Sequence, residues 1–102
     1  MDERLTEANF TKHLNTVFRV KVSAPRLVEL KLVEVKGYAS GANDPKGMER
    51  FSLFFNGPGD LQLPQHTYEL EHDHLGSLDI FLVTVAQDER GFLYEAVFNY
   101  FK

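Results

Sequence analysis

The chain has 102 residues, a formal net charge of −4, nine Phe and four Tyr, and no cysteine. This length is typical of one domain with a single core, so residues 1–102 are expected to form one domain. The absence of cysteine excludes thiol chemistry and disulfides. The negative net charge argues against a nucleic-acid surface, which needs clustered cations.

The chain start lacks the charged, then apolar, then small-residue pattern of a secretory signal peptide. No uninterrupted apolar run reaches the 18 or so residues that a membrane-spanning helix needs. We therefore expect a cytoplasmic protein without a membrane partner.

Residues 5–14 form the best helix candidate in the chain. Thr6 can cap the first turn with its hydroxyl, and Phe10 and Leu14 share one face because they are four residues apart. Asn15 is a plausible end, since Asn tolerates left-handed backbone geometry. A helix this short needs packing to be stable, so we expect it to close one end of a β-core.

Two strands are predicted next, at 17–22 and 27–36. In the first, Phe18, Val20 and Val22 alternate with cations. In the second, the apolar positions are even up to Leu32 and odd from Val33. Alternation cannot change phase without an extra residue, so a bulge or bend is expected there.

The middle of the chain alternates polar connections with short strands. Loops are predicted at 37–49 and 56–65, because both are rich in Gly and Pro. Strands are predicted at 50–55 and 67–71. Phe54 falls on the opposite face from Phe51, Leu53 and Phe55, and is either covered by the helix or exposed.

The stretch Leu75–Phe101 reads as a long hairpin around which the other strands are arranged. Its turn is predicted at 87–91, which ends in a Gly that can adopt positive φ. The strand 78–85 is apolar at successive positions, so both of its faces are expected to be covered. The returning strand carries an aromatic stripe on one face: Phe92, Tyr94, Phe98 and Tyr100.

Six strands without a helical crossover long enough for parallel pairing predict an antiparallel meander. The fold class is therefore all-β: a six-stranded antiparallel barrel or a two-sheet sandwich, with one short N-terminal helix.

The chain resembles a small bacterial domain family of unknown function. The resemblance is carried by five blocks: Phe51–Pro58, Leu63–Gln65, Tyr68–His72, Leu75–Val83 and Tyr94–Asn99. Thr84 stands where Pro is common in the family, and His66 where Gly is common. The resemblance implies a β-fold, no established activity, and an association with phage-tail-like or collar proteins, near which members can be encoded.

The residues that could carry out chemistry do not form a recognised catalytic, metal-binding or phosphate-binding motif. His66, His72 and His74 lie close together and could bind a transition metal, but a solvated turn is the ordinary explanation. The run 57–59 resembles a phosphate loop only in its glycines. Glu95 could be a buried acid, although such a residue more often points to solvent or pairs with a cross-strand cation. No serine lies in a nucleophile-elbow context, so we expect no enzymatic activity and no cofactor.

The aromatic stripe is the strongest physical signal, and it is interpreted mainly as core. Its alternative is a protein interface formed by Phe54, Tyr94, Tyr100 and Phe101. We therefore expect a non-enzymatic protein-interaction or assembly module that binds a protein partner or itself as a homo-oligomer. The alternative is a small-molecule-binding β-barrel, which six strands disfavour because a ligand-sized interior usually needs eight.

Overall fold

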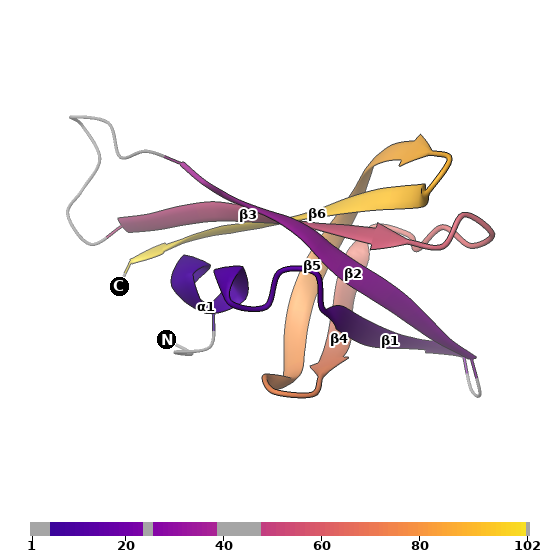
Figure 1. Ribbon diagram of the computed structural model, residues 1–102, viewed down its shortest axis with the longest axis horizontal. Coiled ribbons are helices and arrows are strands. Elements are labelled where there is room, and N and C mark those ends of the chain that lie inside the picture. Colours follow the sequence, from indigo (N-terminus) through magenta and orange to yellow (C-terminus); the bar gives the residue numbers. More distant parts are fainter. Residues whose placement is uncertain (1–4, 24–25, 39–47, 102) are drawn as a thin grey trace.

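Alternating apolar side chains produce six strands in the computed structural model, which describes residues 5–23, 26–38 and 48–101 (Figure 1). All pairs are antiparallel, and the strands close into a barrel. The all-β prediction with one short helix is therefore confirmed, in its barrel form. The elements are α1 (Glu7–Thr11), β1 (Val17–Ser23), β2 (Arg26–Gly37), β3 (Met48–Gly57), β4 (His66–His72), β5 (Gly76–Asp88) and β6 (Gly91–Phe101).

Helix α1 begins at the predicted Thr6 cap, but it ends at Thr11, before the predicted stop at Asn15. The Thr6 hydroxyl accepts a hydrogen bond from the Asn9 backbone N–H at 3.1 Å. Asn15 has φ 67° and reverses the chain towards β1. Its N–H donates to the Leu32 carbonyl at 2.7 Å, which ties the linker to β2. A side-chain hydroxyl thus caps the start of the helix, and a backbone hydrogen bond fixes the segment that follows it.

The phase change in β2 is a bulge at Val33, as expected. Leu32 pairs with Phe55 and Glu34 with Phe54, so Val33 has no partner in the ladder with β3. The inward face changes from Leu32 to Val35, which packs against the core, while Val33 itself faces solvent. The extra residue lets one strand contribute to two parts of the barrel wall.

The strand order is β1-β2-β3-β6-β5-β4, with β4 closing onto β1. The meander prediction is wrong, because β6 lies between β3 and β5. The ladder of β3 with β6 runs from Met48↔Phe101 to Gly57↔Phe92, so β6 occupies the edge that a meander would leave for β4. Residues 58–65 instead carry the chain to the far side of β5.

The barrel interior is filled by the predicted inward residues. Phe51, Leu53 and Phe55 of β3 lie opposite Phe98, Ala96 and Tyr94 of β6 and share the core with them. Phe10 of α1 closes the wall near this ladder, with ring centroids 6.0 Å from Phe51 and 5.7 Å from Phe98. Figure 1 shows α1 lying beside β3 and β6. The core interpretation of the aromatic stripe is supported by the complete burial of Tyr94.

The outer face of β5 departs from its prediction. Leu78, Ile80 and Leu82 point inward and are buried, but Phe81 is 48% exposed and Val85 is 47% exposed. The expectation that both faces are covered is therefore wrong for the described chain. A single-layered barrel has only one buried face, because its wall is one sheet thick. Val85 is also a bulge, since Thr84 pairs with Tyr94 and Ala86 with Leu93.

Candidate functional site

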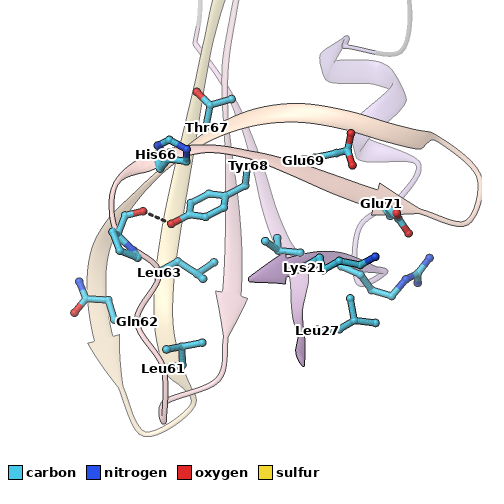
Figure 2. Close-up of a pocket in the computed structure, with 13 residues that line it drawn as sticks. Lys21, Leu27, Leu61, Gln62, Leu63, His66, Thr67, Tyr68, Glu69 and Glu71 are labelled. Atoms are coloured by element: carbon cyan, nitrogen blue, oxygen red, sulfur yellow. Dashed lines mark hydrogen bonds between the residues drawn. The ribbon is translucent and has the colours of Figure 1, made fainter. Parts of the chain in front are cut away.

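A groove opens along the seam where the barrel closes. β1 and β4 pair only at Arg19↔Glu71 and Val20↔Leu70, whereas β1 pairs with β2 along most of its length. Beside this short ladder lies a pocket of about 770 Å³ (Figure 2). Its lining comes from β1, β4, Leu27 of β2 and the loop that precedes β4.

Two tyrosines hold that loop in place. The Tyr68 hydroxyl donates to the Pro64 carbonyl at 2.6 Å, a bond drawn in Figure 2. The Leu63 N–H donates to the Tyr94 hydroxyl at 2.8 Å. Burial raises the pKa of both phenols, with the neighbouring Tyr94 adding to the effect on Tyr68 and the Leu63 bond opposing it at Tyr94. Both hydroxyls are therefore protonated at neutral pH and act as structural hydrogen-bonding groups.

The walls of the groove differ in character. Leu27 is 51% exposed, and the partly exposed Leu61 and Tyr68 add apolar surface. The groove-lining charges are Arg19 and Lys21 on β1, and Glu69 and Glu71 on β4. Arg19 already has a partner, because its guanidinium donates a hydrogen bond to the Asp73 carboxylate at 2.8 Å. The groove therefore combines an apolar lining with charges of both signs.

The groove residues Leu27 and Leu61 were not singled out by the sequence. Leu27 occupies the outward phase of its strand, the phase that Glu29 and Lys31 share, and it is exposed. The sequence signal that could have pointed to Leu27 is that it is apolar, whereas its neighbours on that face of the strand are charged. Leu61 carried no such signal, because it lies in a loop without periodicity.

Of the four residues predicted to form an interface, Tyr94 and Phe54 are described with their side chains, and these two do not share a surface. Tyr94 is completely buried, so it belongs to the core. Phe54 is half-buried on the outer face of β3, in a different place from the groove. The side chains of Tyr100 and Phe101 lie outside the described residues, although their backbone belongs to β6.

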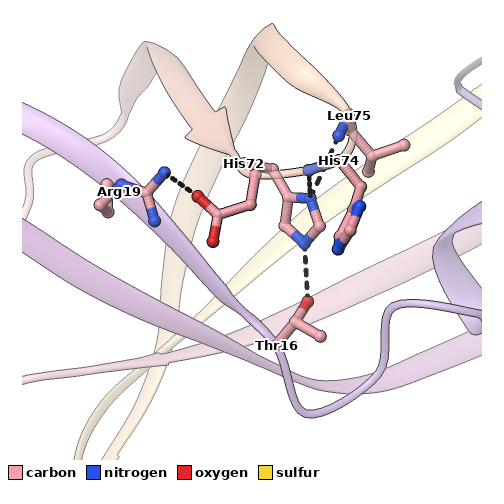
Figure 3. Close-up of polar contacts among 6 residues, drawn as sticks. Thr16, Arg19, His72, His74 and Leu75 are labelled. Atoms are coloured by element: carbon pink, nitrogen blue, oxygen red, sulfur yellow. Dashed lines mark hydrogen bonds and ion pairs between the residues drawn. The ribbon is translucent and has the colours of Figure 1, made fainter.

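His72 is the most constrained of the histidines (Figure 3). Its Nδ1 accepts hydrogen bonds from the backbone N–H groups of His74 at 3.0 Å and Leu75 at 3.2 Å. Nδ1 therefore carries no proton, and Nε2–H donates to the Thr16 hydroxyl at 2.9 Å. That hydroxyl in turn donates to the His13 carbonyl at 2.6 Å. The neutral ring thus links the turn after β4 to the segment between α1 and β1.

The pKa of His72 lies below its ordinary value, first because the ring is buried and then because His13 and His74 lie nearby. Arg19 adds to this lowering, while Asp73 opposes it. The side chain is only 5% exposed, so a proton on Nδ1 would be poorly solvated and would break two hydrogen bonds.

We expect the protein to lose stability as the pH falls from about 6.5, the ordinary pKa of His. Above that pH, His72 is neutral in both states and its full contribution is present. Below it, the unfolded chain binds a proton before the folded chain does, so the unfolding free energy falls until the lower folded pKa is passed. Urea unfolding at pH 7.5, 6.5 and 5.5 measures this change.

His72→Asn should flatten this pH dependence, because an Asn carbonyl can accept the two turn N–H bonds without titrating. His66→Asn is the matched control, since His66 is an exposed residue of β4. An unchanged pH profile in His72→Asn would contradict the assignment.

Of the three histidines considered as metal ligands, His66 lies apart from His72 and His74. His66 lies against Tyr68 at the groove, while His13 joins His72 and His74 instead. Within residues 5–23, 26–38 and 48–101, no group of three His, Asp or Glu side chains is arranged to hold a metal ion. Gly57 and Gly59 pack against Gly91 of the last hairpin, which gives them a structural role.

Glu95 forms a small polar network on the outer face of β3 and β6. The buried Ser52 hydroxyl donates to its carboxylate at 2.7 Å, so the Tyr38 hydroxyl donates to Ser52 at 2.8 Å. This arrangement satisfies the buried serine. The sequence favoured a carboxylate that points to solvent or pairs with a cation, whereas the carboxylate here accepts from a serine hydroxyl.

The fold and groove define a small closed antiparallel β-barrel with an incomplete seam. Within the described ranges, no helix is long and apolar enough to cross a bilayer. The chain belongs to the family described as Domain of unknown function (DUF6916), which matches residues 5–98. No curated protein and no solved structure matches this chain.

Proposed function

We propose that the domain is a non-enzymatic protein-interaction module that takes an extended segment of a partner protein into the groove between β1 and β4. The observation that carries this proposal is the short β1–β4 ladder, which stops at Val20↔Leu70 while both strands continue. A strand edge beyond its ladder presents backbone donors and acceptors at the spacing of another strand.

The groove chemistry supports a peptide as the occupant. Backbone bonds to β1 or β4 would supply affinity, and alternate side chains of the segment would enter the apolar part beside Leu27, Leu61 and Tyr68. Lys21, Glu69 and Glu71 would set its direction and register, because charges of both signs discriminate between orientations.

Selection of peptides from a random displayed library against the intact domain tests the proposal. We expect extended sequences with alternating apolar residues. Leu27→Glu should weaken their binding by about tenfold or more, because a charge would occupy the apolar wall. Val33→Glu is the matched control, since Val33 is also an exposed apolar residue of β2 but lies outside the groove.

Peptides that bind Leu27→Glu as tightly as the unchanged protein would contradict this site. Failure to select any peptide would contradict the proposed class of partner.

A small-molecule site is the second candidate, favoured by the groove volume of about 770 Å³, which lies within the range of ligand pockets. Thermal-shift screening of the same two variants distinguishes it, since a small ligand would stabilise the unchanged protein and not Leu27→Glu. The expected association with phage-tail-like proteins stays a prediction that the neighbouring genes would test.

A further inference from the structure

The two strands that border the groove differ in how well they could accept another strand. β4 pairs with β5 along its whole length without a break in register. In β1, Val22 has no partner in the ladder with β2, because the register shifts between Lys21 and Ser23. A bulge bends its strand and disturbs the spacing of the backbone groups, which makes an edge less suitable for pairing. The regular edge of the groove therefore belongs to β4.

β1 itself shows what kind of strand this edge accepts. Where the two strands pair, Arg19 lies opposite Glu71 and Val20 lies opposite Leu70. Val20 and Leu70 are buried in the core, so Arg19 and Glu71 share the outer face of the sheet. The covered part of the β4 edge thus takes a strand with a cation outside and an apolar residue inside. The same edge continues through His66–Glu69, with which no described strand pairs on the groove side.

The charges beside the uncovered edge are mainly acidic. Glu69 and Glu71 are exposed on the same outer face of β4, because they are two residues apart on one strand. Neither carboxylate has an ion-pair or hydrogen-bond partner within the described part of the chain. Of the groove cations, Arg19 donates to Asp73, so Lys21 remains beside two carboxylates. This imbalance favours a cation in the groove, and the net charge of −4 favours the approach of a basic segment.

The inner side of the groove is apolar. Tyr68 has the same phase on β4 as the buried Leu70, and it packs against the core while staying partly exposed. Leu61, in the loop before β4, lies in the same way, and both residues line the groove (Figure 2). A side chain that lies level with Tyr68 on an added strand would contact its ring, because directly opposite residues of paired strands are neighbours. An apolar side chain suits this position.

We propose that the partner is a basic extended segment that adds as a strand to the edge of β4 at His66–Glu69, with a lysine or arginine level with Glu69 and an apolar residue level with Tyr68. This inference rests on the proposed function, because it names the edge and the class of partner for the same groove. The segment would repeat the pattern of Arg19 and Val20, so the pairing of β4 would continue beyond its two positions with β1.

Two synthetic peptides test the charge preference. One alternates valine with lysine, and the other alternates valine with glutamate. The lysine peptide should bind about fivefold more tightly or better at low ionic strength, because opposite charges on paired strands attract and like charges repel. Glu69→Lys should reduce this preference by about fivefold or more. Glu89→Lys is the matched control, since it makes the same change in net charge at an exposed residue outside the groove.

Amide hydrogen exchange measured by NMR locates the edge. With the lysine peptide bound, exchange should slow at alternate N–H groups within His66–Glu69, because alternate residues of a strand direct their N–H groups to one neighbour. Exchange at Lys21–Ser23 should change little. N-methylation of one alternating set of peptide nitrogens should abolish binding, whereas methylation of the other set should be tolerated, since a strand bonded to one edge uses one set.

Equal affinities for the two peptides, or a preference that Glu69→Lys leaves intact, would overturn the basic class of partner. Slowed exchange at Lys21–Ser23 in place of β4 would overturn the edge. In these cases the proposed function would stand, because library selection with Leu27→Glu tests the groove without reference to charge or edge. A lysine peptide that does not bind, beside library peptides that do, would also overturn the inference alone. Correct folding of every variant is established by the position of its urea unfolding midpoint.

Discussion

Phe10→Ala should lower the unfolding free energy by about 3–5 kcal/mol, the usual cost of removing a fully buried Phe side chain. Phe10 is completely buried, and its ring lies 6.5 Å from Phe18, 6.0 Å from Phe51 and 5.7 Å from Phe98 between centroids. Five helical residues are too few to be stable alone, so α1 depends on this contact. Urea unfolding with a lowered midpoint and an unchanged slope measures the loss.

Lys12→Ala is the control for this substitution. Lys12 is exposed at the end of α1, so its removal should change the unfolding free energy by less than about 0.5 kcal/mol. A loss below about 1 kcal/mol in Phe10→Ala would mean that the helix is not part of the core.

Gly91→Ala should cost about 3 kcal/mol or more. Gly91 begins β6 with φ 117°, a conformation that costs a residue with a Cβ about 1–3 kcal/mol. An added Cβ would also collide with the Gly57 carbonyl oxygen and lie 3.0 Å from the Gly59 nitrogen. Both are backbone atoms, so no side-chain rotation can relieve the collision. The turn between β5 and β6 must shift, and the unfolding midpoint should fall accordingly.

Gly59→Ala provides the matched control on the other side of this contact. Its added Cβ would lie 3.5 Å from the Gly91 Cα, an ordinary van der Waals distance. We expect a change within about 1 kcal/mol. Equal losses in the two variants would show that close packing at Gly91 is not the cause.

Several local features were predictable because they depend on neighbouring residues only. The Thr6 cap, the left-handed Asn15 and the Val33 bulge all follow from side-chain chemistry or from a change of apolar phase within a few positions. The inward faces of β3 and β6 followed from alternation in the same way.

Other features depend on which strand edges meet, and periodicity carries no such information. The insertion of β6 between β3 and β5 is one example, and the contact of His13 with His72 is another. The groove is a third, because it arises where β1 and β4 separate after two paired positions. Alternation also cannot tell an inner barrel face from an outer one, so the sequence leaves Tyr94 open to both a core and an interface interpretation.

The amino-acid sequence was enough to predict an all-β fold with a short capped helix, the inward residues of most strands and the absence of thiol chemistry. These properties come from residue type and short-range spacing. The strand order, the groove beside the short β1–β4 ladder and the exposure of Val33 at the β2 bulge follow only from the tertiary structure. Those properties depend on long-range pairing and on the single-sheet thickness of the barrel wall, which leaves the outer side chains of its strands exposed.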